Sequence, residues 1–341
     1  MTEAVAGRPD FLPPGLGEIL TAASRVLILT HHNPDGDALG SAAGLALTML
    51  KTGREVDVHL TGSWAEHLNF LLDGLNVKTG LDDPAGYDLV VLLDCHSFDR
   101  LGPGGLTLAA GLAKAPRPAP LVVLDHHLLT PDEQTGPNSI LDSGASSTGE
   151  LVWGLIRALG WLPPRPALRA ILVAVTTDTG FFSQSNTRAE TLRAAADLVE
   201  LGGSLEEVDR LVNKSLPLRR MKLMGLALET LTLHFGGRLA ALTVTPEMLA
   251  KTGALMADTE DFVELGRSLA GVTLAALIKD SGWGPGSVRV SLRSREDVDA
   301  ASLARHFGGG GHRQASAYND PQAANAREAL ENLLSLAEKF L

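Results

Sequence analysis

The chain has 341 residues, of which 45% are hydrophobic, so it can bury a core of normal size and is not a disordered chain. Its length leaves room for two domains or one large one. The net charge of −11 at pH 7 argues against a protein that grips long nucleic acid through bulk electrostatic attraction. The acidic excess lies in residues 1–214, which contain 26 acidic and 15 basic side chains, whereas the remainder is neutral.

The first half of the chain alternates short apolar runs with helical stretches. The apolar runs have the length of strands and lie at residues 26–30, 55–60, 88–94 and 121–125. The helical stretches lie at residues 38–52, 147–159, 168–175 and 188–201. Because continuous apolar strands separated by helices are typical of a sheet that is buried on both faces, this half predicts an α/β domain with a parallel sheet.

The pattern changes at Gly202 and Gly203, after which residues 204–226 indicate a polar, helical connector. The elements expected beyond it are two strands flanking a glycine pair as a hairpin, 228–235 and 238–244, a helix at 259–269, a second strand pair at 273–279 and 287–294, and an amphipathic helix at 321–340. We therefore predict an N-terminal parallel-sheet domain over residues 1–202, a helical linker over 203–226 and a smaller C-terminal α/β domain over 227–341.

The sequence gives less information about cellular location and oligomeric state. No apolar run approaches the roughly 20 residues that cross a bilayer, and the N-terminal residues lack the basic and apolar regions of a secretory signal. We therefore expect a cytoplasmic protein that does not associate with membranes. The single cysteine, Cys95, excludes a disulfide framework and fits a small buried residue. The apolar residues of 216–226 leave two interpretations open, an interdomain hinge and a homodimer surface.

Acidic and histidine side chains follow three of the predicted strands. The first strand runs into the sequence HHNPDGD at residues 31–37, and the two others end in Asp94 and in the tripeptide DHH at 125–127. The carboxyl ends of parallel strands meet at one edge of a sheet, where ligands bind. Asp178, which follows the apolar run 171–175, belongs to the same group if that run leads to the same edge. The residues expected there are His31, Asp35, Asp37, Asp94, Asp125, His126, His127 and Asp178.

So many carboxylates and imidazoles at one edge repel one another unless cations neutralise them. Mixed imidazole and carboxylate ligands suit Mn²⁺, Mg²⁺, Fe²⁺ or Co²⁺ better than metals that prefer thiolates. The number of ligands suits two ions about 3.5–4 Å apart, with one aspartate bridging them. Such a pair generates hydroxide at neutral pH and holds both oxygens of an in-line displacement at phosphorus.

Four ordered motifs carry a family resemblance. The pattern H-x-x-P-D-x-D-A-x-G-S over residues 31–41, together with DHH at 125–127, resembles the DHH phosphoesterase superfamily. The run GGGGH at 308–312, preceded by the strand 288–293, is similar to the C-terminal DHHA1 substrate domain of that superfamily. Order and spacing match over nearly the whole chain. The compact two-domain length most resembles the bacterial nanoRNase, or oligoribonuclease and pAp phosphatase, branch.

The resemblance implies a role for each polar residue at the sheet edge. The implied metal ligands are His31 and Asp35 for the first ion, Asp37, His126 and Asp178 for the second, and Asp94 as a bridge between the two. Asp94 and His127 are the expected catalytic residues, His127 facing the substrate phosphate as a charge stabiliser or proton donor. Asp125 either orients the histidines from behind or is a plain acceptor at the end of a strand. His32 lies outside the matched pattern and is expected to be structural or exposed.

The loop and helix after the first strand carry smaller expectations. Pro34 favours an extended Asn33, and Gly36 lets the backbone turn between two ligands. Gly40 and Ser41 are expected at the start of a helix, where they either bind phosphate or allow close helix packing. The Ser/Thr run 146–148 resembles a motif near the metal centre of the family, but we favour an N-cap at its second residue, completed by a glutamate three residues later.

The glycine run near the C-terminus invites comparison with phosphate-binding loops. It lacks the Gly-Lys-Ser/Thr ending of a nucleoside-triphosphatase loop. It is either a flexible turn or a place where the backbone approaches a substrate phosphate or ribose, with contacts from Gly309, Gly310, Gly311 and His312. Arg289 and Arg293 lie on the preceding strand and either bind a terminal phosphate or are ordinary solvated residues. The resemblance implies that this domain closes over the substrate and selects it.

The expected function is a two-metal phosphohydrolase that uses two divalent ions, with Mn²⁺ ahead of Mg²⁺, Co²⁺ or Fe²⁺. Its expected substrates are RNA a few nucleotides long, pApA and 3′-phosphoadenosine 5′-phosphate, without binding to long duplexes. A cyclic-dinucleotide phosphodiesterase and a RecJ-like single-strand exonuclease are the main alternatives. The run 308–312 argues against a family II inorganic pyrophosphatase, and the complete ligand set argues against a non-catalytic nucleotide-binding protein.

Overall fold

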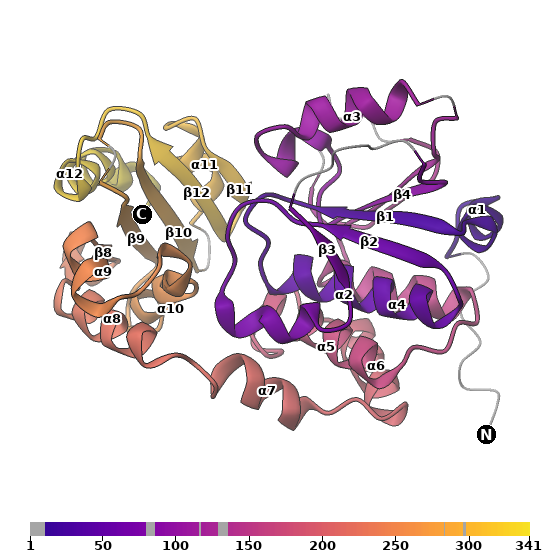
Figure 1. Cartoon of the computed structure of the whole chain (residues 1–341). Coiled ribbons are helices and arrows are strands. Elements are labelled where there is room, and N and C mark those ends of the chain that lie inside the picture. Colours follow the sequence, from indigo (N-terminus) through magenta and orange to yellow (C-terminus); the bar gives the residue numbers. More distant parts are fainter. Residues whose placement is uncertain (1–10, 80–85, 116, 129–135, 283, 296–297) are drawn as a thin grey trace. The chain divides into compact units, whose positions relative to one another are not determined.

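The computed structural model describes residues 11–79, 86–115, 117–128, 136–282, 284–295 and 298–341. The chain folds into two compact units, Met1–Ser215 and Leu216–Leu341. The boundary between them lies inside the segment 203–226. Figure 1 shows the elements of each unit along the chain. Along the described ranges, none of the helices is long and apolar enough to cross a bilayer.

The first unit contains a six-stranded sheet whose strands are all parallel, as expected. In spatial order its strands are β3 (Asn76–Lys78), β2 (Glu55–His59), β1 (Arg25–Thr30), β4 (Leu89–Leu93), β5 (Leu121–Asp125) and β6 (Ser139–Leu141). The four predicted strands form its centre. The two outer strands have three residues each, which is too short for an apolar pattern, and the sequence did not reveal them.

Helices cover both faces of this sheet, as Figure 1 shows. Val26 and Ile28 of β1 face one core, while Leu27 and Leu29 face the other. The first face is covered by α2 (Gly36–Lys51), α4 (Thr148–Ala158) and α5 (Arg165–Asp178), with α1 (Leu16–Ala22), α6 (Ala189–Glu200), α7 (Leu205–Asn213) and the 3₁₀ helix η1 (Glu66–Leu72) around them. The second face is covered by η2 (Phe98–Leu101) and α3 (Gly105–Ala113).

Glycines let α2 approach α5 closely. A Cβ at Gly40 would lie 2.5 Å from the Ala170 carbonyl oxygen, and one at Gly36 would lie 2.5 Å from Thr177 Oγ1. We expected Gly40 and Ser41 at the start of this helix, but they lie one turn inside it and are buried. Close helix packing accounts for Gly40, whereas the hydroxyl of Ser41 donates to Asp37. Gly36 is not a turn residue either, because it is already helical and its small size serves the contact with α5.

The second unit contains a mixed six-stranded sheet. In spatial order its strands are β11 (Gly310–His312), β12 (Ala315–Asp320), β10 (Val288–Ser294), β9 (Leu274–Asp280), β8 (Leu239–Val244) and β7 (Thr232–His234), antiparallel except for β8 and β9. One face packs on α11 (Ala300–Arg305) and α12 (Ala326–Ala337), and the other on α8 (Leu218–Glu229), α9 (Pro246–Thr252) and α10 (Phe262–Arg267). The 3₁₀ helix η4 (Met256–Thr259) lies between α9 and α10 in the chain.

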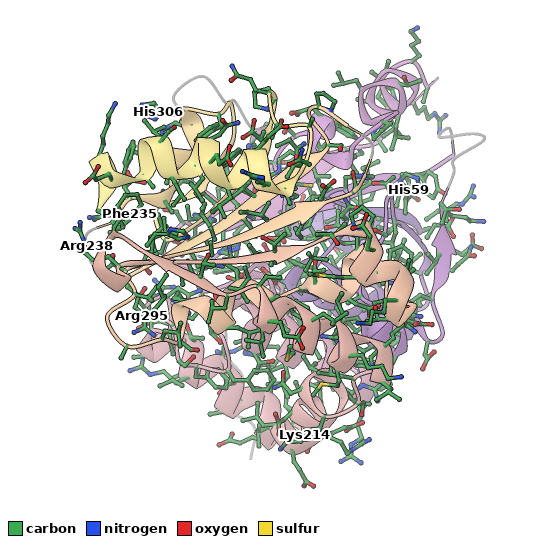
Figure 2. All side chains as sticks on the ribbon, turned by 90° about the vertical axis from the view of Figure 1, so that its left-hand side faces the viewer. His59, Lys214, Phe235, Arg238, Arg295 and His306 are labelled. Atoms are coloured by element: carbon green, nitrogen blue, oxygen red, sulfur yellow. The ribbon has the colours of Figure 1, made fainter. Side chains whose placement is uncertain are left out.

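The predicted hairpin is present as β7 and β8, joined through the short 3₁₀ helix η3 (Phe235–Gly237). Its first strand begins later than predicted, because α8 continues to Glu229 and packs Leu223 and Ala227 into the core. The connector 204–226 forms two helices that belong to different units, since α7 packs Val208 against the first core. Figure 2 shows the described side chains as sticks and labels Phe235 and Arg238, which lie in the connection of this hairpin.

Candidate metal centre

The ends of β1, β4 and β5, the start of α2 and the end of α5 bring the predicted residues together. Among the described residues, three groups of His and Asp place their ligand atoms within 4.8 Å of one another: His31, Asp35 and Asp94; Asp37, His126 and Asp178; and Asp94, His126 and His127. The first two groups have the composition expected for two metal sites, and Asp94 adjoins both. This arrangement places all six predicted ligands in one cluster.

Asp94 lies at the centre of the cluster. Its Oδ2 is 3.4 Å from Nε2 of His31, and its Oδ1 is 3.6 Å from Nε2 of His126. Asp94 has a left-handed backbone, with φ at 58°, which an aspartate adopts more readily than most residues. Its N–H still donates to the Leu124 carbonyl (3.0 Å). The chain thus turns sharply at the end of β4 and directs one carboxylate oxygen toward each histidine.

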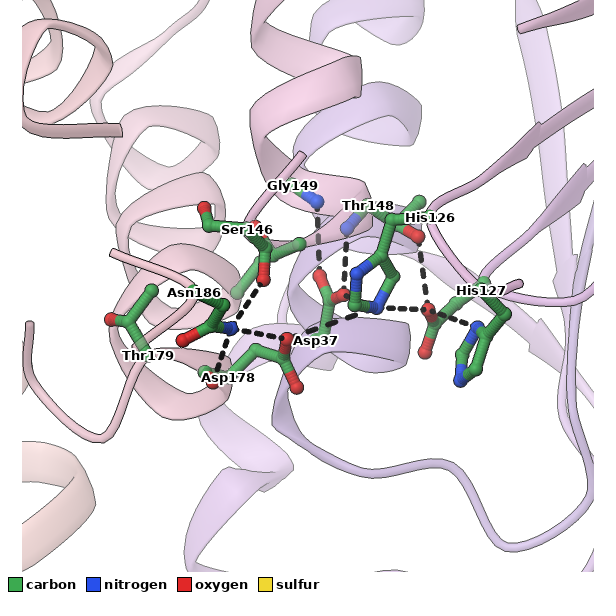
Figure 3. Close-up of polar contacts among 12 residues, drawn as sticks. Asp37, His126, His127, Ser146, Thr148, Gly149, Asp178, Thr179 and Asn186 are labelled. Carbon is green, nitrogen blue, oxygen red and sulfur yellow. Dashed lines mark hydrogen bonds and ion pairs between the residues drawn. The ribbon is translucent and has the colours of Figure 1, made fainter. Parts of the chain in front are cut away.

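Asp37 is held by the start of a helix that comes much later in the chain. Its Oδ2 accepts from the backbone N–H of Thr148 (2.7 Å), and its Oδ1 accepts from the N–H of Gly149 (2.9 Å) and the hydroxyl of Ser41 (3.0 Å). Figure 3 shows the contacts of Thr148 and Gly149 with Asp37 beside His126, whose Nε2 lies 3.6 Å from Asp37 Oδ2. Free N–H groups at a helix start favour an anion, so α4 fixes this carboxylate in place.

Thr148 also donates its hydroxyl to Asp94 Oδ1 (2.9 Å), so one residue supports carboxylates of both groups. The predicted N-cap is confirmed: Ser147 Oγ accepts from the N–H of Glu150 (3.1 Å). The cap explains only part of the Ser/Thr run, because the residue after it contacts the centre. A threonine directly after an N-cap was the available signal, and our preference for a purely structural cap missed it.

Asp178 is the last residue of α5, where a negative charge opposes the helix dipole. Its Oδ2 lies 3.7 Å from His126 Nε2. Asn186 Nδ2 donates to the Asp178 carbonyl (3.0 Å), to the Ser146 carbonyl (3.0 Å) and, at 3.4 Å, to the Asp178 carboxylate (Figure 3). A carboxylate in this unfavourable position gains most from a nearby cation. Sequence reasoning missed Asn186, because no local pattern marks it.

Asp125 lies behind the cluster and is completely buried. Its Oδ1 accepts from Nδ1 (2.6 Å) and the backbone N–H (3.1 Å) of His127, and its Oδ2 lies 2.7 Å from Nδ1 of His96. Of the two interpretations of Asp125, these contacts fit the orienting one. His127 Nδ1 is also 3.7 Å from Asp94 Oδ1. His96 was not singled out from the sequence, since it stands outside the matched motifs.

Burial and mutual repulsion set the charges of the cluster. Burial raises the pKa of Asp37 well above its usual value, and the charges of Asp94 and Asp178 raise it further. Burial also raises the pKa of Asp178 to about 7, although His126 opposes the change. Burial alone would raise the pKa of Asp94, but hydrogen bonding to His31 and the neighbouring imidazoles hold it below its usual range. Without added positive charge, these carboxylates do not all ionise at neutral pH.

The carboxylates around His31 favour the charged form of its imidazole. Burial lowers its pKa, but the hydrogen bond to Asp94 and the charges of Asp35 and Asp94 outweigh burial and raise it to about 9. A proton on this imidazole takes the place that a cation would take. Divalent ions suit the centre for the same reason, since the donor set is entirely carboxylate and imidazole.

The loop before α2 shows one wrong expectation and one correct one. Asn33 is left-handed, with φ at 56°, and not extended. Its N–H donates to the Thr61 carbonyl (3.0 Å) and its Oδ1 accepts from the Ser63 N–H (2.8 Å), so tertiary bonds outweigh the local effect of the following proline. For His32 the structural interpretation fits, because its Nδ1 lies 3.3 Å from Thr61 Oγ1 and its backbone N–H donates to the Arg100 carbonyl (2.7 Å). Cys95 is buried, also as expected.

In the second unit, four of the six predicted substrate residues, Arg289, Arg293, Gly310 and His312, share one face of the sheet, whereas Gly309 and Gly311 do not. Arg289 and Arg293 alternate with buried residues along β10. Arg293 pairs across β12 with Ala315, which in turn pairs with His312 of β11. By the same register Gly310 lies on this face. Arg293 Nε lies 3.4 Å from a carboxylate oxygen of Glu264, so that arginine is partly neutralised.

Gly309, which precedes β11, and Gly310 and Gly311, which lie in it, differ in what surrounds them. A Cβ at Gly309 would collide with the Ala317 carbonyl, and one at Gly311, whose φ is 132°, would lie 2.5 Å from the Ala315 carbonyl. Gly310 has open space where its Cβ would be. Two of the glycines are therefore needed for packing against β12, and Gly310 is the one that leaves the surface open.

Comparisons with known proteins agree with this geometry. Residues 25–177 match the family described as DHH family, N-terminal domain, and residues 236–341 match the DHHA1 domain. The bifunctional oligoribonuclease and PAP phosphatase NrnA of Thermus thermophilus is 32% identical over 87% of this chain and 85% of that protein. The Bacillus subtilis protein of the same description is 26% identical over 85% of this chain and 88% of that one.

A solved structure supports the same assignment at the level of the fold. The crystal structure of an exopolyphosphatase-related protein from Bacteroides fragilis superposes with a TM-score of 0.81, covering 94% of this chain and 95% of that one, at 24% identity. At that identity the likeness concerns the fold alone. Two family domains in order and a relative above 30% identity over most of both chains agree with the motifs and the cluster. The chain therefore belongs to the DHH family and carries a DHHA1 domain in its C-terminal unit.

Proposed function

We propose that this chain is a two-metal phosphohydrolase that degrades RNA a few nucleotides long, such as pApA, and dephosphorylates 3′-phosphoadenosine 5′-phosphate. The observation that carries the proposal is the pair of three-residue groups with Asp94 adjoining both. The substrate class follows the names of the two relatives that match most of the chain. The net charge of −11 fits a protein that contacts one or two phosphates and does not hold a long strand.

The residues present fit two divalent ions. His31 and Asp35 would hold the first ion, and His126, Asp37 and Asp178 the second, with Asp94 shared between them. Because each group contains an imidazole, we propose Mn²⁺ ahead of Mg²⁺, which prefers oxygen ligands alone. When bound, two such ions lower the pKa of a water molecule and hold the oxygens of an in-line displacement at phosphorus.

The chain's own residues would orient the substrate and move the proton. We assign to His127 the stabilisation of the phosphate or the transfer of a proton to the leaving oxygen through Nε2. Its Nδ1 is held by the carboxylate of Asp125, which fixes the ring and favours its protonated form. In the second unit we assign to Arg289, Arg293, Gly310 and His312 the contacts to the rest of the substrate, since they share one sheet face.

The test is hydrolysis of pApA, 3′-phosphoadenosine 5′-phosphate, cyclic di-AMP and pyrophosphate in parallel, with Mn²⁺ present. We expect turnover of the first two, lost in Asp94→Asn and kept in the matched control Asp57→Asn, a carboxylate of β2 that bonds Tyr87 away from the cluster. Turnover of pyrophosphate alone, or of cyclic di-AMP alone, would overturn the assignment of the substrate. Activity that survives Asp94→Asn would overturn the two-metal centre.

A further inference from the structure

Asp125 bonds two different histidines, and only one of them has a role in the proposed function. His127 occupies Oδ1 at 2.6 Å, while His96 lies 2.7 Å from Oδ2. Asp125 is completely buried and the side chain of His96 is 4% exposed, so bulk water does not compete for the bond between these two side chains. His96 belongs to none of the candidate metal groups among the described residues. Its imidazole is thus placed on the carboxylate and not on the cluster.

His96 joins two loops that leave neighbouring strands. It follows Asp94 by two residues beyond the end of β4, whereas Asp125 ends β5, and the two strands pair in parallel. The bond between His96 and Asp125 therefore ties the loop that begins with Asp94 to the carboxylate behind His127. The side chains of His96 and Asp125 are in direct contact, and no movement of β4 or β5 is needed to bring them together.

A carboxylate that is held at one oxygen can still turn about its Cβ–Cγ bond. A second short hydrogen bond at the other oxygen opposes that rotation and fixes the carboxylate plane. The direction of the His127 Nδ1–H depends on this plane, because Oδ1 accepts from both Nδ1 and the backbone N–H of His127. A carboxylate acceptor also requires a proton at Nδ1 of each ring, which leaves Nε2 as the nitrogen through which His127 acts.

We propose that His96 is a positioning residue for His127: acting through Asp125, it fixes the imidazole that faces the substrate phosphate. The inference rests on the proposed function for the role of His127. It adds a residue that acts on the reaction through another one.

Kinetics of two variants test the proposal in Mn²⁺-saturated protein. His96→Leu removes the donor, whereas His96→Asn retains an N–H close to the position of Nδ1. We expect His96→Leu to lower kcat for pApA by roughly 10–100-fold, the usual effect of losing such a partner, with KM and Mn²⁺ affinity unchanged. His96→Asn should recover most of kcat. Wild-type kcat in His96→Leu, an equal loss in both variants, or a loss confined to KM or Mn²⁺ affinity would overturn the proposal.

His59→Leu is the matched control, because His59 is another buried imidazole of the same unit and bonds the Thr79 backbone. It should keep the wild-type kcat. A kcat loss in His59→Leu equal to that in His96→Leu would show that removing any buried histidine has this effect. If His96→Leu does not fold, His96→Gln, which carries its amide one bond farther out, provides the same comparison with His96→Asn.

A spectroscopic measurement separates this proposal from the proposed function. In Mg²⁺-loaded protein labelled with ¹⁵N-histidine, the Nδ1–H of His127 should give a downfield proton signal, assigned by its loss in His127→Asn. We expect this signal to move or broaden in His96→Leu and to stay in His96→Asn. This measurement does not depend on turnover. If the wild-type protein hydrolyses neither pApA nor 3′-phosphoadenosine 5′-phosphate, only the proposed function is overturned. An unchanged signal in His96→Leu defeats the positioning role.

Discussion

Gly36 lies directly against Thr177, with room for a hydrogen atom but not for a methyl group. Gly36 stands between Asp35 and Asp37, and Thr177 immediately precedes Asp178. The contact therefore sets the spacing between the acids that begin α2 and the acid that ends α5. Small size at one position thus controls the geometry of two carboxylates that are 141 residues apart in the chain.

We predict that Gly36→Ala lowers both stability and activity. The Thr177 hydroxyl donates to the Val173 carbonyl (2.8 Å), so it cannot turn away without losing that bond. The added methyl group must therefore push α2 from α5, which costs about 1–3 kcal/mol in a packed core and moves Asp37 from Asp178. Thermal unfolding and the rate of pApA hydrolysis measure the two effects. Gly225→Ala, in α8 with open space around it, should instead stabilise by about 0.5–1 kcal/mol.

The two ligand groups should lose metal independently. Asp35→Asn is expected to weaken one Mn²⁺ site and Asp178→Asn the other, leaving one tightly bound ion in each variant. Asp94→Ala should weaken both, because its oxygens face both groups. Activity should fall in all three by more than the roughly 10–100-fold that an outer hydrogen-bond partner contributes. Titration with Mn²⁺ followed by electron paramagnetic resonance counts the sites; two intact sites in Asp94→Ala would refute the shared ligand.

Metal-free protein should lose stability as the pH rises from about 4 to 9. The folded pKa of Asp178 is raised from 3.8 to about 7, so its ionised form is disfavoured by folding and the penalty grows across that interval. The folded pKa of His31 is raised from 6.5 to about 9, so its stabilising effect is complete below pH 6.5 and is lost by about pH 9. Both changes therefore lower the stability of the folded protein as the pH rises.

Thermal unfolding in a chelator at pH 5.5, 7 and 8.5 measures this loss. Excess Mn²⁺ should remove most of it, because the ions neutralise the carboxylates, and Asp178→Asn should flatten the part below pH 7. A chelated protein that is more stable at pH 8.5 than at pH 5.5 would contradict the charge distribution of the cluster.

The glycine run of the second unit should divide by function. Gly310→Ala is expected to fold with an unchanged melting temperature, since open space surrounds that position, and to raise KM for pApA roughly tenfold if the backbone there approaches the substrate, equivalent to about 1.4 kcal/mol. Gly309→Ala should destabilise the unit, because its methyl group meets the Ala317 carbonyl. Calorimetry and initial rates on both variants separate the two effects. An unchanged KM in Gly310→Ala would remove Gly310 from the substrate site.

The central strands of the first sheet could be predicted because burial on both faces produces continuous apolar runs such as 89–93. Edge strands of three residues leave no such pattern, so β3 and β6 could not be predicted from the sequence. The start of β7 was wrong because the apolar side chains before it serve a helix core and not a strand. Local preference failed at Asn33 for a related reason, since bonds to Thr61 and Ser63 outweigh the neighbouring proline.

The ligand cluster could be predicted because its members follow strands or stand in a recognisable motif, and the strand order then gathers them. The residues that hold the members of this cluster in place could not be predicted. Thr148, Asn186 and His96 act on partners that lie 8 to 111 residues away in the chain, through contacts that only the folded arrangement creates. Nothing about their neighbours in sequence distinguishes them from ordinary polar residues.

The bonds that hold Asp37 restrict how it can bind a metal ion. A carboxylate oxygen offers two lone pairs. The two hydrogen bonds from Gly149 and Ser41 occupy both at Oδ1, whereas Oδ2 accepts from Thr148 alone. One lone pair remains, on the oxygen that lies 3.6 Å from His126 Nε2. An ion held here would therefore reach Asp37 through Oδ2 alone, a restriction set jointly by Ser41 of α2 and by Thr148 and Gly149 in the first turn of α4.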